Sequence, residues 1–185
     1  MKFQKYMAVG ILGLTMALGF SGCQSENQKN QDAYRKIGIN SMAEGDYDKA
    51  VKSFQKALDT SLGKIGAEEI DICYYKAAAQ FAKKDYDGAI ETYTSLIDYD
   101  KENANAYYLR GSVYLDTDKK DKAFKDYKNA VKYAGREYEI YEGIYENLTN
   151  KGETEEAKNY LKKALDIKPK DGADYAEQGH VYYLL

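Results

Sequence analysis

Few of the residue types that carry out catalysis are present in this sequence of 185 residues, and those present are not arranged as a catalytic site. His180 is the only histidine, so a histidine-based triad would depend on this one residue, and no serine or cysteine lies in a recognisable nucleophile motif. The sequence also lacks glycine-rich phosphate-binding motifs and the paired cysteines of zinc sites. These features favour a protein that is not an enzyme and that uses no cofactor or metal.

The acidic segment 116–121, with the sequence DTDKKD, is the part of the chain most similar to a metal-binding motif. It resembles the beginning of a calcium-binding loop because aspartates alternate along it. Lysine occupies the third ligand position, however, and the glycine that such a loop needs is missing. We therefore expect a solvated turn between two helices here.

The amino terminus has the pattern of a bacterial export signal. Two lysines precede an uncharged, mainly apolar run at residues 7–20, which is too short to span a bilayer comfortably. The sequence F-S-G-C that ends at Cys23 resembles the lipobox of bacterial lipoproteins. This resemblance implies that residues 1–22 are a signal peptide, that Cys23 carries lipid, and that the protein is anchored in the cell membrane on its extracytoplasmic side. The alternative is an ordinary secretory signal followed by an incidental cysteine.

The segment after the signal and the overall charge limit the classes of partner. Residues 23–30 are polar and predict a flexible tether. The formal charge of the chain is −3, which argues against binding to nucleic acid. The second cysteine, Cys73, has no histidine or cysteine nearby in the sequence, so we interpret it as a buried helix residue rather than a redox centre.

Two sets of landmarks recur through the rest of the chain with the same period. Alanines are separated by 39, 34 and 34 residues, at Ala50, Ala89, Ala123 and Ala157. Tyrosines are separated by 40, 33, 34 and 34 residues, at Tyr34, Tyr74, Tyr107, Tyr141 and Tyr175. Apolar residues after each landmark follow the 3.6-residue period of a helix. Each repeat is therefore predicted to be two amphipathic helices joined by a polar turn.

A 34-residue helix-turn-helix repeat with small residues at fixed inward positions resembles the tetratricopeptide repeat. The most regular copy lies at 105–134. The resemblance implies an all-α, right-handed solenoid with a concave surface. It places the repeat domain at 31–185, with about four helix-turn-helix units at 31–64, 71–103, 104–137 and 138–171 and a C-terminal capping or truncated helix at 172–185.

The repeats differ from one another at three places. Residues 61–69 add about six residues to the period and predict a longer surface loop. The second repeat lacks the glycine found in the turn of the first, so we expect its turn to be one residue shorter. The last half-repeat ends in the apolar sequence VYYLL, which indicates either a longer array or an end that docks on a partner.

The family resemblance also implies a partner-binding groove, lined by fixed positions of each first helix. Carried over to this chain, these positions are Arg35, Ile39, Met42, Tyr75, Ala79, Asn105, Tyr108, Ser112, Leu115, Glu139, Glu142 and Glu146. They change along the chain from basic and apolar, through an apolar middle, to acidic. Such a surface is typical of binding to an extended peptide or a partner helix. Any one of these positions is equally typical of a solvated helix surface.

These observations give one leading hypothesis and two alternatives. The first is a non-enzymatic, membrane-anchored scaffold that binds a peptide or partner protein in the groove. The second is an assembly or maturation factor within a larger complex of the cell envelope. The third is a lipoprotein that binds a glycan or another small ligand through its tyrosines.

Overall fold

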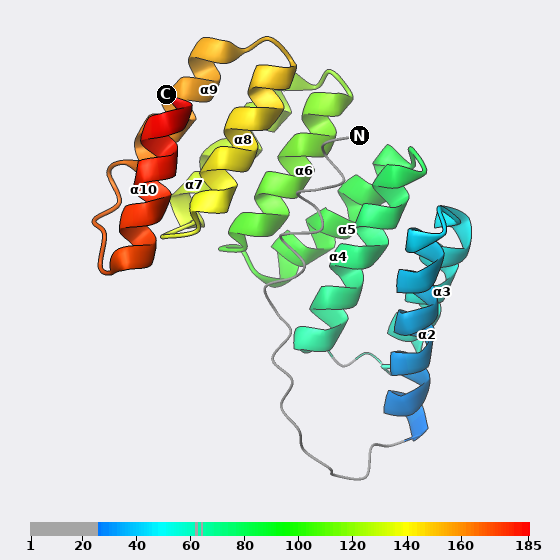
Figure 1. The fold of residues 1–185 in the computed structure, drawn as a ribbon. Coiled ribbons are helices and arrows are strands. Elements are labelled where there is room, and N and C mark those ends of the chain that lie inside the picture. Colours follow the sequence, from blue (N-terminus) through cyan, green and yellow to red (C-terminus); the bar gives the residue numbers. More distant parts are fainter. Residues whose placement is uncertain (1–25, 62, 64) are drawn as a thin grey trace. The chain divides into compact units, whose positions relative to one another are not determined.

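The computed structural model describes residues 26–61, 63 and 65–185, and all of the regular structure in these residues is α-helical (Figure 1). The signal peptide at 1–22 and Cys23 lie outside the described residues. The helices are α2 (Glu26–Ala43), α3 (Tyr47–Asp59), α4 (Ala67–Ala82), α5 (Tyr86–Tyr99), α6 (Ala104–Asp116), α7 (Lys120–Tyr133), α8 (Tyr138–Asn150), α9 (Thr154–Ala164) and α10 (Gly172–Leu184).

The chain divides into two compact units, which meet in the sequence between Tyr99 and Asp100. The N-terminal unit contains the hairpins α2–α3 and α4–α5, and the C-terminal unit contains the hairpins α6–α7 and α8–α9 followed by α10. The four hairpins lie at 26–59, 67–99, 104–133 and 138–164. One predicted boundary moves, because α2 begins at Glu26 and residues 26–30 of the expected tether are helical.

Three residues separate the two helices of every hairpin, which corrects the prediction of a shorter turn in the second repeat. One residue in each turn has a positive φ angle: Gly45 at 79°, Lys84 at 67°, Asp118 at 58° and Gly152 at 82°. These positions have the same spacing as the alanine landmarks. Lysine thus takes the left-handed conformation that glycine takes in the first turn, at some cost in backbone strain. The turn length is a property of the repeat, whichever residue occupies the turn.

Polar side chains cap several of the helices that follow a turn or loop. Asp46 accepts a hydrogen bond from the backbone nitrogen of Lys49 at the start of α3, and Asn103 accepts one from Ala106 at the start of α6. At α4 the Glu69 carboxylate accepts from the backbone nitrogen of Gly66 at 2.9 Å. Each cap satisfies an amide that has no partner inside the helix. The loop before α4 therefore ends at Gly66, earlier than the predicted 61–69.

In the first and third hairpins the core forms where a glycine on the first helix meets a ring on the second. A Cβ atom on Gly38 would lie 2.5 Å from the Phe54 ring, and one on Gly111 would lie 2.8 Å from the Tyr127 ring. Phe54 and Tyr127 have no exposed surface. Glycine at these positions allows the helices to approach closely, which explains the recurring small residues in the sequence.

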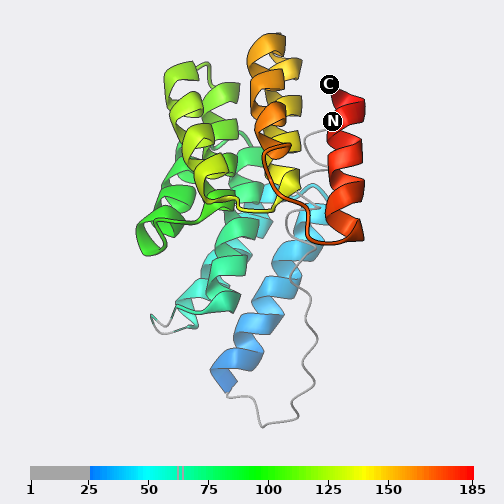
Figure 2. The same ribbon diagram turned by 90° about the vertical axis from the view of Figure 1, so that its left-hand side faces the viewer.

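The last helix packs less closely than the others. Of its residues only Val181 is buried, and it joins the core of the C-terminal unit. The Gln178 side chain donates a hydrogen bond to the carbonyl oxygen of Ile167, which ties α10 to the end of the fourth hairpin. Figure 2 shows α10 as the outermost helix at the carboxyl end of this unit. It occupies the place of a first helix in a fifth repeat, as its spacing predicts.

Candidate functional site

The predicted groove positions fall on the first helices of both units, and each unit is described by itself. We call Arg35, Ile39, Met42, Tyr75 and Ala79 the N-terminal face; they lie on α2 and α4, which are side by side. Ala79 is completely buried, and the other four side chains are half-buried. Ala79 therefore supports this face from below and offers no surface to a partner.

Arg35 connects the two hairpins of the N-terminal unit. Its Nε donates a hydrogen bond to Oδ2 of Asp71 at 2.9 Å, and its guanidinium carbon lies 5.3 Å from the centre of the Tyr75 ring. The Tyr75 ring also stacks on Phe54, with a centroid distance of 5.6 Å. Asp71 balances the charge of Arg35, so this residue does not supply the excess positive charge expected at the amino end of the groove.

A carboxyl pair lies beside this ion pair. The pKa of Glu68 is raised to about 7, first by burial and then by a hydrogen bond and charge repulsion from Asp32. A carboxyl group that stays protonated near neutral pH can share its proton with a neighbouring carboxylate. Gln31 adds a third link between α2 and α4 through a hydrogen bond to Glu69 at 2.7 Å. Polar links that are partly open to solvent thus join these helices beside the apolar cluster that Ile39, Met42 and Ile72 share.

The remaining predicted positions form the C-terminal face, on α6 and α8: Asn105, Tyr108, Ser112, Leu115, Glu139, Glu142 and Glu146. Ser112 and Leu115 are buried. They belong to the interior and not to a contact surface. Tyr108 is half-buried, and its phenol lies against Gly143, where a Cβ atom would collide with the hydroxyl group. The half-buried Tyr108 therefore packs against Gly143 of the neighbouring hairpin.

Ser112 has a structural role that its predicted position did not reveal. Its hydroxyl accepts a hydrogen bond from the Asn147 side-chain amide at 2.8 Å and donates one to the carbonyl oxygen of Tyr108 at 2.9 Å. The Tyr127 hydroxyl lies 3.4 Å from both the Ser112 hydroxyl and the Asn147 amide. This buried, uncharged network joins the third and fourth hairpins. Burial raises the pKa of the Tyr127 phenol, so the group stays neutral.

The three glutamates of the C-terminal face differ in exposure. Glu139 is exposed, and Glu142 and Glu146 are half-buried. Oε1 of Glu142 lies 2.8 Å from Nδ1 of His180. Burial raises the pKa of Glu142, although His180 acts in the opposite direction. The single histidine of the chain thus contacts a carboxylate on the predicted surface, and its ring stacks on Tyr183.

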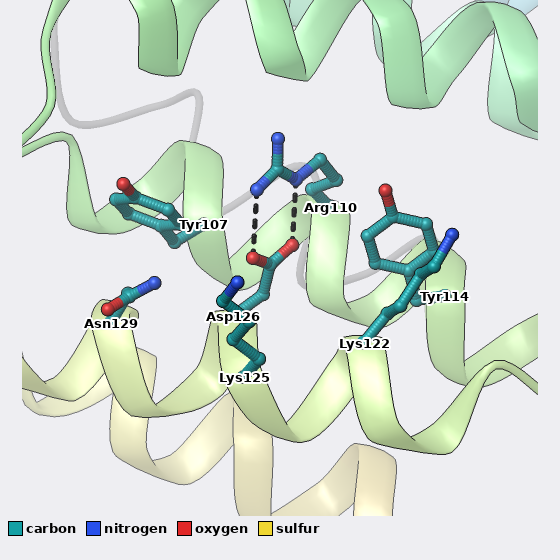
Figure 3. Close-up of a pocket in the computed structure, with 7 residues that line it drawn as sticks. All are labelled: Tyr107, Arg110, Tyr114, Lys122, Lys125, Asp126 and Asn129. Atoms are coloured by element: carbon teal, nitrogen blue, oxygen red, sulfur yellow. Dashed lines mark hydrogen bonds and ion pairs between the residues drawn. The ribbon is translucent and has the colours of Figure 1, made fainter.

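A pocket of about 360 Å³ lies on the side of the third hairpin (Figure 3). Arg110 and Asp126 form a two-pronged ion pair in it, with nitrogen–oxygen distances of 2.7 and 2.9 Å. The rings of Tyr107 and Tyr114 lie 5.7 and 5.9 Å from the guanidinium carbon. The pocket is completed by Lys122, Lys125 and Asn129. Its walls combine aromatic rings with charged and amide groups.

The sequence contains a signal for this ion pair. Arg110 occupies the third position after the opening tyrosine, where the other repeats have Ile37, Ala77 and Ile144. A charged residue at a position that is otherwise apolar needs a charged partner when it is buried. Asp126, at 4% side-chain exposure, is that partner.

Neither cysteine chemistry nor metal chemistry has a site in the described residues. Cys73 is half-buried, and burial raises the pKa of its thiol, which disfavours the reactive thiolate. Over the described ranges, no group of three or more histidine, cysteine, aspartate or glutamate side chains is placed to hold a metal ion. In the same ranges no helix is long and apolar enough to cross a membrane.

Comparison with models of protein families identifies the family to which the repeats belong. Models described as TPR repeat or Tetratricopeptide repeat match residues 35–93, 77–118, 104–136 and 146–171. The chain is a tetratricopeptide-repeat protein. The predicted all-α fold class is thus confirmed, and the hairpins described above are its repeats. A comparison with curated protein sequences finds no match.

Solved structures of tetratricopeptide-repeat proteins resemble this one. The crystal structure of MamA is 26% identical, with a TM-score of 0.57 over 74% of this chain and 77% of that chain. TTC0263 of Thermus thermophilus, a thermophilic TPR protein, is 18% identical with a TM-score of 0.58, covering 83% of this chain and 81% of that one. PilF of Pseudomonas aeruginosa is 17% identical with a TM-score of 0.58, covering 86% and 70%. These likenesses describe the fold.

Proposed function

We propose that this tetratricopeptide-repeat protein is a non-enzymatic scaffold, anchored to the membrane through lipid on Cys23, that binds a protein partner on its first-helix faces. Tetratricopeptide-repeat domains generally bind protein partners and are generally not enzymes. The repeat fold supports the scaffold function, and the lipobox-like sequence supports the anchor.

The observation that carries this proposal is the composition of the C-terminal face. Tyr108 is fixed against Gly143 with its ring half-exposed, and the glutamates of α8 lie on the same face. A rigid aromatic side chain supplies contact area at small entropic cost, and neighbouring carboxylates orient a basic ligand. The partner segment should therefore combine an apolar anchor with lysine or arginine.

The test is crosslinking of the full chain in its native cell, followed by identification of the crosslinked partner. The Tyr75→Ala/Tyr108→Ala double variant should lose that partner, and Glu139→Gln should weaken its capture at low salt. Tyr99→Ala is the matched control, because Tyr99 is an exposed tyrosine outside both faces. A double variant that keeps every partner of the wild type would refute binding on these faces. Co-purification of a stable membrane complex would specify the function further, as an assembly or maturation factor.

The membrane anchor has a separate test. Mass measurement of the protein extracted from membranes should show a chain that begins at Cys23 and carries acyl chains. Cys23→Ser should move the protein from the membrane to the soluble extracytoplasmic fraction, since one covalent lipid group is its proposed attachment. Retention of the serine variant in the membrane would contradict lipid anchoring and leave the scaffold proposal intact.

The pocket on the third hairpin favours a second candidate function, the binding of a glycan or a similar small polar ligand. Tyrosine rings beside arginine, aspartate and asparagine side chains are suited to sugar rings and their hydroxyl groups. Oligosaccharides should then raise the melting temperature of the full chain while basic peptides do not. Asn129→Ala should abolish that shift. Stabilisation by peptides alone would exclude this candidate.

A further inference from the structure

His180 brings α10 to the edge of the C-terminal face. It occupies the fifth position after the opening Tyr175, as Ser112 does after the opening tyrosine of α6 and Glu146 after that of α8. Nδ1 of His180 lies 2.8 Å from Oε1 of Glu142, which belongs to that face. The imidazole therefore extends the surface formed by the glutamates of α8.

The imidazole is the more exposed member of this pair. The Glu142 side chain keeps 19% of its surface exposed, whereas the His180 side chain keeps 52%. The His180 ring is also stacked on Tyr183, with an angle of 17° between the two rings. A cation that binds the Glu142 carboxylate from solvent therefore competes with the imidazole for it.

Acidic side chains dominate α8 and α10. The α8 sequence contains three glutamates, and the α10 sequence contains Asp174 and Glu177. Neither helix contains lysine or arginine, so His180 is the one side chain of these two helices that can carry a positive charge. Histidine ordinarily changes its charge between pH 5 and 8. The charge of this part of the surface should therefore change in the same range.

The elements around the pair contribute other charged groups. These are Glu139 and Glu146 on α8, Glu177 on α10, and the ion pair of Arg136 with Asp174 at the beginning of the two helices. Glu139 and Glu177 both add negative charge near Glu142. The segment after α9 meets α10 through backbone carbonyl groups, which accept hydrogen bonds from Gln178. The surroundings of Glu142 thus favour a basic ligand.

We propose that Glu142 is a subsite for a lysine or arginine side chain of the partner, and that His180 competes with this side chain and weakens partner binding when it is protonated. The inference rests on the proposed binding at the C-terminal face and adds its regulation by pH. A protonated imidazole makes a charge-assisted hydrogen bond to the carboxylate and also repels a basic ligand. A neutral imidazole makes only the weaker hydrogen bond, which a cation can replace.

The probe is the peptide KLKYKL, acetylated and amidated at its ends, which places lysines beside apolar side chains. The matched peptide QLQYQL keeps the apolar side chains and has no charge. His180 is the only histidine, so its ring signals in proton NMR of the full chain without a histidine tag need no further assignment. At pH 7.5 the lysine peptide should shift these signals with saturation, and the glutamine peptide should not. Absence of binding by the lysine peptide at millimolar concentration would overturn the subsite.

The decisive variant is His180→Gln, which keeps a hydrogen-bond donor and removes the change of charge. Calorimetric titration should show that the wild type loses about threefold to fivefold more affinity for the lysine peptide between pH 8 and pH 6 than the variant does, as expected for a partly exposed ion pair. Burial raises the pKa of Glu142, so protonation of this carboxyl group weakens binding in acid in both proteins. The difference between them therefore reports the imidazole alone, and it should shrink in about 1 M NaCl.

Glu142→Gln tests the subsite itself. It should weaken binding of the lysine peptide at pH 8 several-fold and abolish the shift of the His180 signals. The control is Glu155→Gln, at an exposed glutamate of α9, which should change neither result. A Glu142→Gln protein that binds as tightly as the wild type would place the lysine side chains elsewhere.

The competition and the scaffold function can fail independently. An equal loss of affinity between pH 8 and pH 6 in the wild type and in His180→Gln would overturn the competition, and binding on the first-helix faces would stand. Conversely, the crosslinked partner could survive the Tyr75→Ala/Tyr108→Ala double variant while the lysine peptide keeps its His180-dependent response to pH. That outcome would refute the scaffold function and leave the subsite in place.

Discussion

The two compact units link the first helices of their hairpins by different polar contacts. In the N-terminal unit, α2 and α4 are linked by the ion pair of Arg35 with Asp71 and by carboxyl groups that include Glu68. In the C-terminal unit, α6 and α8 are linked by the buried hydrogen bonds of Ser112 and Asn147. The first contact is charged and partly solvated. The second is neutral and removed from water.

This difference predicts which conditions each unit responds to. Partly exposed charges are screened by salt and change with pH, so the contact in the N-terminal unit should be adjustable. Buried neutral hydrogen bonds contribute little net energy while intact but cost much when one partner is removed. The network of Ser112 and Asn147 in the C-terminal unit should therefore be indifferent to salt and pH near neutrality and intolerant of substitution.

The largest effect should come from Asn147→Ala, which removes the donor at the centre of the buried network. The substitution leaves the hydroxyl groups of Ser112 and Tyr127 without this amide and opens a cavity. Loss of a buried hydrogen-bond partner together with a cavity should cost about 2–4 kcal/mol. Hydrogen exchange of α6 and α8 amides, followed by mass spectrometry, should show the loss in the C-terminal unit only.

Asn150→Ala provides the control for that experiment. Asn150 is exposed at the end of the same helix, so its replacement should change the exchange of α6 and α8 little. Equal effects of the two substitutions, or an Asn147→Ala effect that shrinks in high salt, would mean that the contact is not the neutral buried network described above.

Asp71→Asn should have the next largest effect, in the N-terminal unit. It removes the charge that balances Arg35 while it keeps the side-chain shape. A partly buried ion pair of this kind is worth about 1 kcal/mol. The loss, measured by exchange of α2 and α4 amides, should be clear at low salt and small in about 1 M NaCl, where screening is strong. A loss that does not depend on salt would show that the two units do not differ in the proposed way.

The sequence predicted the hairpins well because period, small residues and turn length are local properties. Contacts between hairpins were harder to predict from the sequence. The pairing of Arg35 with Asp71 spans 36 residues, and its register depends on how two helices lie against each other. For the same reason Ser112 and Leu115 were placed on the groove surface, although the rotation of α6 buries both. A helix position gives an angle around the axis, and the neighbouring helices decide which angles are exposed.

The Glu68→Gln substitution tests the difference between the two units through the pH dependence of the stability of the N-terminal unit. The pKa of Glu68 is raised from its ordinary 4.5 to about 7 in the folded protein, chiefly by burial. The folded state therefore binds this proton more tightly than the unfolded state. The stabilisation is fully present below about pH 4.5 and is lost as pH rises through 7. The variant should remove that slope and stabilise the N-terminal unit at about pH 8 by about 1 kcal/mol or less, since the group is partly exposed.

Denaturant unfolding of both proteins from acidic to mildly basic pH measures this slope. The exchange of α8 amides should be the same in the wild type and in Glu68→Gln after correction for intrinsic rates, because Glu68 belongs to the N-terminal unit. A wild-type N-terminal unit that becomes more stable as the pH rises through neutrality would show that Glu68 is ionised in the folded protein.

The smallest effect should come from the turns, where the two units place different residues in the same conformation. Lys84 and Asp118 both have a left-handed backbone, with φ angles of 67° and 58°. Aspartate tolerates this conformation better than lysine, since its short side chain bonds locally to the backbone. Lys84→Gly should therefore stabilise the N-terminal unit by about 0.5 kcal/mol, while Asp118→Gly should change the C-terminal unit little. Chemical denaturation monitored by hydrogen exchange in each hairpin gives the change in stability for both variants. A larger stabilisation by Asp118→Gly than by Lys84→Gly would mean that backbone strain in the turn depends on the surrounding hairpin more than on the residue.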